Sequence, residues 1–151
     1  MTNTIFVGFE RVRDVQIPEK AYEDDAGFDL FIPKDVGDIS QYKLADYGFL
    51  IPSGLKLQLP TGYCAILQNR SSIARAGYRV GACVLDAGFR AEFMIHLIGS
   101  THSPKLQPGQ KVVQMVILPV PYVQLGECKI TIDTERGSRS FGSSDKETSS
   151  G

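Results

Sequence analysis

The stretch KVVQMVILPV at residues 111–120 decides the fold, because it is apolar on both faces apart from Gln114. A strand with this pattern is covered on both sides. We expect its own core to cover one face and a neighbouring subunit to cover the other. The stretch therefore predicts a β-strand in a protein that assembles into an oligomer.

Two further stretches, residues 55–60 and 93–98, alternate with the period of two that is typical of strands. Gly and Pro interrupt short apolar runs along the chain, a spacing typical of an all-β sandwich or barrel. One short helix is predicted over SSIARAG at residues 71–77. Ser71 or Ser72 would cap its first turn and Gly77 would end it.

Size, charge and cysteine usage narrow the class of protein. The 151 residues suffice for one domain, and the formal net charge of −1 argues against duplex nucleic acid or an anionic membrane as partner. Three cysteines without a C-x-x-C pair suggest neither disulfides nor zinc. Without a predicted signal peptide or membrane span, we expect an intracellular, cytoplasmic protein, or a nuclear one if the source is eukaryotic or viral.

Composition changes near residue 133, which divides the chain into a β domain at 1–132 and a flexible C-terminal tail at 133–151. The tail holds one large apolar residue, Phe141, among Ser, Gly and charged residues. Two interpretations stay open. The tail is frayed, or it is a lid that stacks an aromatic ring on a base while Arg136 and hydroxyl groups hold phosphate.

Chemistry-bearing residues fall in five ordered segments: AGFDL at 26–30, NRSSIARAG at 69–77, VGACVLDAGFRAEF at 80–93, GQKVVQMVILPV at 109–120 and RGSRSFGSS at 136–144. This series is similar to the five motifs of the trimeric dUTP pyrophosphatases (dUTPases). The resemblance implies a distorted, jelly-roll-like β-barrel or sandwich that forms a homotrimer with active sites at subunit interfaces. It also implies hydrolysis of dUTP to dUMP and pyrophosphate, which limits uracil in DNA and supplies dUMP for thymidylate synthesis.

In the second motif, Arg70 offers a planar fork for phosphate oxygens, and Ser71 and Ser72 offer hydroxyl donors. The alternative is that Arg70 pairs with a carboxylate while the serines only cap the helix. In the third motif, Asp86 precedes an Ala-Gly turn, so its carboxylate should stand at the rim of a hairpin. The resemblance makes Asp86 the catalytic group that deprotonates the water attacking the α-phosphorus.

Mg²⁺ is the cofactor that phosphoryl chemistry of this kind implies, bridging the triphosphate oxygens. No all-protein cage is visible in the sequence, so Asp29 is expected to contact the ion through water. The alternative for Asp29 is a solvated surface carboxylate.

The remaining substrate contacts follow from the same resemblance. Main-chain groups at Gly81, Cys83, Val84 and Leu85 would bind uracil, with Met94 lining the pocket. Phe89 stands where the family commonly has Tyr, and its ring would exclude a ribose 2′-hydroxyl. Gln114 would join a phosphate-linked network or an interface hydrogen bond. In the tail, a lid motif would contact phosphate and base through Arg136, Phe141, Gly142, Ser143 and Ser144.

Two other functions remain as alternatives. A dCTP deaminase, or a bifunctional enzyme, shares sequences similar to RSSIAR and LDAGF, but His96 stands where that enzyme carries its catalytic Glu. A non-catalytic β module that senses nucleotides or binds protein would not need Asp86. Neither His96 nor His102 lies at metal-ligand spacing from other donors.

Overall fold

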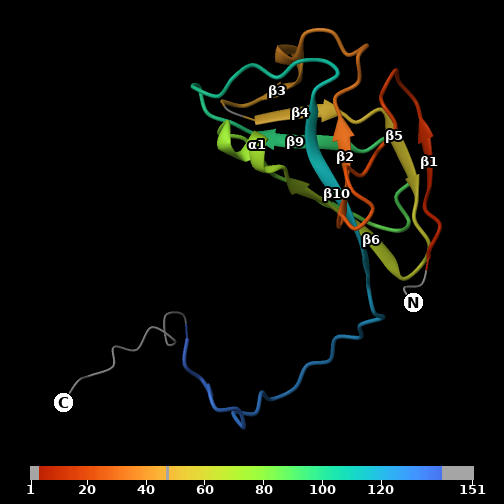
Figure 1. Ribbon diagram of the computed structural model, residues 1–151. Coiled ribbons are helices and arrows are strands. Elements are labelled where there is room, and N and C mark those ends of the chain that lie inside the picture. Colours follow the sequence, from red (N-terminus) through yellow and green to blue (C-terminus); the bar gives the residue numbers. More distant parts are fainter. Residues whose placement is uncertain (1–3, 47, 141–151) are drawn as a thin grey trace.

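The computed structural model describes residues 4–46 and 48–140. Short strands dominate it, with one 3₁₀ helix and one α-helix between them (Figure 1). In chain order the elements are β1 (Gly8–Arg11), β2 (Gly27–Phe31), η1 (Ile39–Tyr42), β3 (Lys43–Leu44), β4 (Gly48–Pro52), β5 (Leu55–Gln58), β6 (Tyr63–Asn69), α1 (Ser71–Arg75), β7 (Arg79–Val80), β8 (Val84–Leu85), β9 (Met94–Ile98) and β10 (Lys111–Pro119).

The strands form two four-stranded sheets and a smaller pair. One sheet has the order β2-β10-β6-β8, the other has the order β3-β4-β9-β7, and β1 pairs with β5. Every one of these pairings is antiparallel. The expected all-β, jelly-roll-like fold is therefore confirmed.

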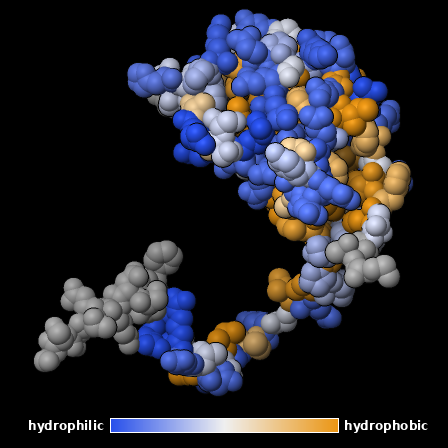
Figure 2. Space-filling view, in the orientation of Figure 1, coloured by the Kyte–Doolittle hydropathy of each residue, from blue (hydrophilic) through white to orange (hydrophobic). Residues whose placement is uncertain are grey.

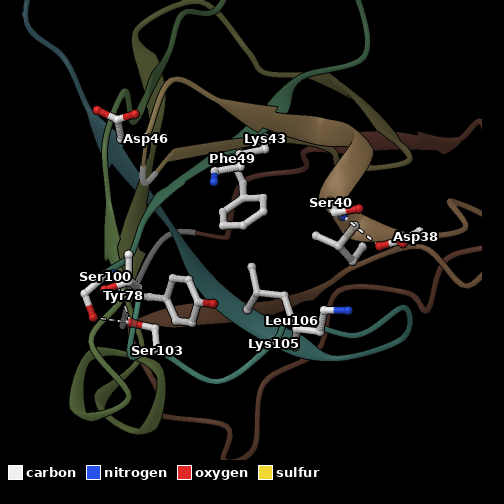
Figure 3. A pocket seen from close by; sticks show the side chains of 12 residues that line it. Asp38, Ser40, Lys43, Asp46, Phe49, Tyr78, Ser100, Ser103, Lys105 and Leu106 are labelled. Atoms are coloured by element: carbon white, nitrogen blue, oxygen red, sulfur yellow. Dashed lines mark hydrogen bonds between the residues drawn. The ribbon is translucent and has the colours of Figure 1, made fainter.

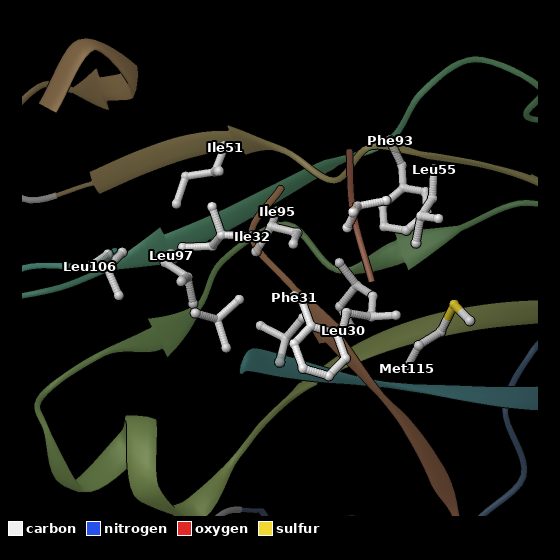
Figure 4. Packing of buried hydrophobic residues seen from close by; sticks show 14 of the residues in the cluster. Leu30, Phe31, Ile32, Ile51, Leu55, Phe93, Ile95, Leu97, Leu106 and Met115 are labelled. Atoms are coloured by element: carbon white, nitrogen blue, oxygen red, sulfur yellow. The ribbon is translucent and has the colours of Figure 1, made fainter. Parts of the chain in front are cut away.

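The core lies between the sheets and draws side chains from both of them (Figure 4). Leu30 and Met115 come from the first sheet, and Ile51, Ile95 and Leu97 come from the second. All five are buried, so the two sheets share one hydrophobic core.

Strand β10 is central, because it pairs with β2 on one side and with β6 on the other. Val112, Val113 and Met115 are buried in its first half. Toward its end Ile117 is half-buried and Leu118 is 38% exposed. The predicted strand is confirmed, and its second half retains the apolar surface for which a neighbouring subunit was expected.

The predicted strand over 55–60 appears as β5, and that over 93–98 appears as β9. Helix α1 stops before Gly77, as expected, but the predicted serine cap is wrong. The N-cap residue is Arg70, whose backbone is extended, and its side chain makes no capping hydrogen bond. Ser71 and Ser72 already lie inside the first turn, where their hydroxyls cannot serve as the cap.

After Pro119 the chain leaves the two sheets and runs away from them (Figure 1). Residues 120–140 are exposed and contain no strand. This extended segment begins before residue 133, where composition placed the start of the tail. It carries large apolar side chains that are 65–94% exposed, namely Tyr122, Val123, Leu125, Ile130 and Ile132.

No helix in the described ranges has the length and apolar character needed to span a lipid bilayer.

Candidate functional site

Arg70, Asp29 and Lys111 form a charged cluster across three strands of the first sheet. Arg70 follows β6, Asp29 lies in β2, and Lys111 begins β10 between them. Arg70 Nε donates to Asp29 Oδ1 at 3.1 Å, and Lys111 Nζ lies 3.2 Å from Asp29 Oδ2. Glu19 lies 3.5 Å from the same Lys111 Nζ, so two cations face two carboxylates, and the corner offers an anionic ligand the remaining N–H donors of Arg70 and Lys111.

The guanidinium of Arg70 is held on more than one side. Its Nη1 donates to the Lys111 carbonyl and to Ser72 Oγ, both at 3.4 Å. The side chains of Arg70 and Asp29 are 27% and 16% exposed, so the pair is partly shielded from water. The carboxylate pairing left open for Arg70 is thus present, and Ser72 contacts Arg70 instead of capping the helix. Asp29 is correspondingly not a solvated surface residue.

Lys111 is a member of this cluster that sequence reasoning missed. It also approaches Glu19 Oε1 at 3.5 Å. Its signal in the sequence was weak, since it is only the charged first residue of an apolar strand. The antiparallel pairing of β10 with β2, which matches Lys111 with Phe31, brings it to Asp29.

Gln114 lies in β10 next to this cluster, opposite Asp29 in β2. Its amide nitrogen donates to the Asn69 carbonyl at 2.9 Å. The expectations for Gln114 were a phosphate-linked network or an interface hydrogen bond, and neither included this backbone carbonyl as its partner. A Cβ at Gly27 would stand 2.8 Å from Gln114 Oε1, so the glycine of AGFDL leaves the room that the amide occupies.

Asp86 lies at the predicted Ala-Gly turn, but the predicted hairpin is wrong, because β8 pairs with β6 whereas the following strand β9 lies in the other sheet. Strand β8 ends at Leu85, and the Asp86 carbonyl accepts from the Phe89 N–H at 3.1 Å to close the Ala87-Gly88 turn. Asp86 is exposed. Phe89 is 45% exposed beside it, so its ring is not part of the core.

Within one chain, Asp86 and Arg70 lie at opposite ends of β6. Leu85 pairs with Ala65 near the start of β6, whereas Arg70 directly follows its last residue. The strand rises roughly 3.3 Å per residue, which puts about 16 Å between Ala65 and Arg70. The structure therefore does not bring these two predicted site residues together in a single subunit.

The segment Gly81 to Cys83 crosses from one sheet to the other. At its start, the Gly81 N–H donates to the His96 carbonyl at 2.9 Å, and the Ala82 N–H donates to His96 Nδ1 at 3.0 Å. At its end, the Cys83 carbonyl accepts from the Leu67 N–H at 2.8 Å. Among the residues that the structure describes, the Cys83 N–H has no hydrogen-bond partner.

Strand β8, with Val84 and Leu85, continues from this crossing and pairs with β6. Met94 lies two residues before His96 on the same face of β9, opposite the buried Ile95. Met94 is half-buried there.

Arg136 is exposed in the segment 120–140, and this segment runs away from the two sheets of its own chain (Figure 1). Its guanidinium donates to the carbonyls of Arg139 and Ser140 at 3.2 Å. The other predicted lid residues, Phe141, Gly142, Ser143 and Ser144, lie outside the described residues.

A separate hollow of about 250 Å³ opens beside Phe49 and Tyr78 (Figure 3). Asp38 lies at its edge, where a hydrogen bond from the Ser40 N–H lowers the pKa of the carboxyl. None of the site residues predicted from the sequence lines this hollow.

In the described part of the chain, no three His, Cys, Asp or Glu side chains gather as a metal cage. Asp29 is the carboxylate at this corner, and both of its oxygens already face a cation. Asp29 therefore offers no free oxygen as a direct ligand, and a hydrated Mg²⁺ here would have to take its ligands from phosphate and water.

The fold and the site define an all-β protein with a corner of arginine and lysine donors for an anionic ligand and an exposed carboxylate at a turn. The dUTPase family model matches residues 13–145, and the chain belongs to this family. It is 38% identical to the deoxyuridine 5'-triphosphate nucleotidohydrolase of Gloeobacter violaceus, over 85% of this chain and 88% of that one. The enzyme of the same name from Clostridium tetani is 35% identical, over 88% and 91% of the two chains.

Solved structures agree on the fold. A mutant dUTPase of Staphylococcus bacteriophage 80alpha with dUpNHpp superposes with a TM-score of 0.75 at 20% identity, over 93% of this chain and 99% of that one. A mutant dUTPase from phage phi11, described with a structural Mg(II) ion, gives a TM-score of 0.64 at 17% identity, over 83% and 98% of the two chains.

Proposed function

We propose that the chain hydrolyses dUTP to dUMP and pyrophosphate, in a homotrimer whose active sites combine residues of different subunits. The observation that carries this proposal is the separation of Asp86 and Arg70 along β6. A water-activating carboxylate and a phosphate-binding arginine have to meet one nucleotide, and within a single chain they are separated by the stretch of β6 from Ala65 to Arg70, which is about 16 Å long. Two copies of the chain supply both groups to one ligand.

The corner formed by Arg70, Asp29 and Lys111 binds the triphosphate. Asp29 and the Lys111 carbonyl hold the guanidinium of Arg70 in place, so the remaining N–H donors of its fork are oriented before the ligand arrives. Lys111 adds a second positive charge. The first turn of α1 has no side-chain cap, which leaves the Ser71 and Ser72 hydroxyls free to donate to phosphate oxygens.

Asp86 acts on the attacking water. Its exposed carboxylate takes a proton from the water as the water oxygen bonds to the α-phosphorus. The bond between the α-phosphorus and the oxygen bridging to the β-phosphorus breaks in line, and pyrophosphate leaves. The product that stays on the nucleoside is a monophosphate.

Mg²⁺ would be held by phosphate oxygens and waters, with Asp29 reaching it through water because Arg70 and Lys111 occupy both carboxylate oxygens. When bound, the ion neutralises phosphate charge that would otherwise repel the incoming water.

The Gly81–Leu85 main chain binds the uracil base. The Cys83 N–H is a donor without a partner in the described chain, as a uracil carbonyl requires. Met94 lies on the same face of β9 as His96, which contacts this main chain. Phe89, exposed beside Asp86, offers its ring face to the deoxyribose, where a 2′-hydroxyl would be buried without a partner.

The C-terminal segment completes the site from another subunit. Its apolar side chains, 65–94% exposed in one chain, gain burial only against a second copy. Figure 2 shows hydrophobic side chains gathered at the end of the body from which this segment departs. Arg136 would then reach the γ-phosphate, and Phe141, Gly142, Ser143 and Ser144 would close over the nucleotide.

The deciding experiment is Asp86→Asn with dUTP and Mg²⁺. Loss of the general base should slow pyrophosphate release about 10³-fold while dUTP binding, followed by calorimetry, is retained. Asp46→Asn, which removes another exposed carboxylate at a turn, is the matched control and should keep the wild-type rate. Unchanged release by Asp86→Asn would remove Asp86 from the mechanism.

A further inference from the structure

His96 is a side chain that the proposed mechanism does not use, yet it contacts the Gly81–Cys83 segment that crosses between the sheets. It lies in β9 on the face opposite the buried Ile95 and Leu97. Its imidazole Nδ1 accepts from the Ala82 N–H at 3.0 Å, and its carbonyl accepts from the Gly81 N–H at 2.9 Å. One residue thus holds two consecutive amides of the crossing segment.

The ring lies directly against the backbone of Gly81. A Cβ at position 81 would stand 2.2 Å from His96 Nδ1, 2.5 Å from Cε1 and 2.8 Å from Cγ. Only glycine therefore permits this contact. The acceptor at Nδ1 also fixes the ring proton on Nε2, which lies toward Gly48 of the adjacent strand β4.

The Gly81-Ala82 peptide plane is where this contact matters. Gly81 has wide backbone freedom, so that plane can rotate unless its N–H is held. On the far side of the crossing, the Cys83 carbonyl is fixed by Leu67. In the part of the chain that the structure describes, the anchor of the Ala82 amide is His96 alone.

We propose that His96 is a positioning residue that sets the orientation of the uracil-binding main chain by holding the Ala82 amide. The proposal rests on the proposed function, in which the Gly81–Leu85 main chain binds the base. The next peptide carries the unpartnered Cys83 N–H that the proposed function assigns to the base, so a shift at Ala82 moves that donor. His96 thereby controls how well the site binds uracil and refuses cytosine, whose exocyclic amine reverses the donor and acceptor pattern.

Two substitutions separate the hydrogen bond from the bulk of the side chain. His96→Leu keeps much of the volume and removes the acceptor, whereas His96→Asn places an amide oxygen near the position of Nδ1. Because the Leu67 N–H holds the Cys83 carbonyl between Ala82 and Asp86, His96→Leu should raise KM for dUTP about tenfold and change kcat less than about twofold. Preference for dUTP over dCTP should fall in the same variant.

His96→Asn should restore KM to within about threefold of the wild-type value. Ile98→Val alters the same face of β9 without touching the crossing segment, and it should keep the wild-type KM. An unchanged KM and base preference in His96→Leu, or a defect in His96→Asn as large as that in His96→Leu, would overturn the proposal.

Amide hydrogen exchange, followed by NMR, tests the same contact without activity. The Ala82 amide should exchange at least about tenfold faster in His96→Leu than in the wild-type protein, and His96→Asn should restore protection. Equal exchange in all three proteins refutes the anchoring by His96. Failure of the wild-type protein to release pyrophosphate from dUTP would instead refute the proposed function, and the exchange data would still decide the role of His96.

Discussion

Arg70 Nε and Asp29 Oδ1 meet at 3.1 Å although 41 residues separate them in the chain. The contact exists because β10 pairs with both β2 and β6 and so brings the second and first motifs to one edge. Asp29 fixes the orientation of the guanidinium, and Lys111 bridges Asp29 and Glu19 beside it. An arginine held in this way loses less side-chain conformational entropy when it binds phosphate.

Arg70→Lys keeps the charge and loses the planar fork. We expect kcat/KM for dUTP to fall about 100-fold, because a lysine cannot contact Asp29 and two phosphate oxygens together. Pyrophosphate release under steady-state conditions measures it. Arg13→Lys is the control, since Arg13 Nε contacts both carboxylate oxygens of Glu92 at 3.0 Å outside the proposed site. Equal losses in the two variants would show that Arg70 has no special role.

Phe89→Ala should weaken the discrimination between dUTP and UTP. The ring is 45% exposed, so its removal should cost less than about 1 kcal/mol of stability. Without the ring a 2′-hydroxyl meets open space, and kcat/KM for UTP should rise relative to dUTP by about tenfold. Phe89→Tyr retains the ring and should retain the preference. If Phe89→Ala keeps the wild-type ratio of kcat/KM for dUTP and UTP, other residues discriminate between the two sugars.

Leu125→Asp should weaken the trimer. Leu125 is 92% exposed in one chain, and in the proposed assembly it is covered by a second copy, where a carboxylate is costly to bury. Sedimentation at micromolar concentration should show a trimer for the wild type and smaller species for the variant. Gln124→Asp adds the same charge at the neighbouring position and should remain trimeric. A wild-type monomer at this concentration contradicts the assembly itself.

Tyr78 makes stability depend on alkaline pH. Burial raises the pKa of its phenol above the usual value of about 10, and the hydroxyl donates to the Pro104 carbonyl at 2.5 Å. The folded state therefore keeps a proton that the unfolded state has released. This contribution to stability is complete below the unfolded pKa and is lost as pH rises through the folded one.

Thermal unfolding between pH 8 and pH 11 measures the effect, in steps of about half a pH unit. The wild-type midpoint should drop more steeply above about pH 10 than that of Tyr78→Phe, which cannot ionise. Tyr78→Phe should be less stable at neutral pH by about 1 kcal/mol, the usual loss for one hydrogen bond. Parallel curves for the two proteins would rule Tyr78 out.

The parts of the fold that the sequence predicted are those with a local pattern. Strands β5, β9 and β10 are long enough to show their period, and the Ala-Gly turn after Asp86 needs only adjacent residues. Strands β7 and β8 hold two residues each and are defined by their partners β9 and β6, so no local pattern could reveal them. The helix cap was misassigned because serine is favoured at that position, whereas the backbone of Arg70 turns first.

The site divides in the same way. The motifs named Arg70, Asp29 and Asp86, but not that the first two form an ion pair while the third lies at the far end of β6. Lys111 and the partner of Gln114 depend on strand register, which composition does not encode. The sequence used His96 to argue against a deaminase and gave it no role in the site, because its contact with Ala82 joins segments 14 residues apart.

The close fit of the His96 imidazole on Gly81 also constrains how this chain can evolve. Any side chain at position 81 collides with the ring, so such a change is tolerated only after position 96 has become smaller. The reverse order would force the His96 ring away from the Ala82 amide. The two positions are therefore epistatic, and relatives that carry a side chain at 81 should have lost the histidine first.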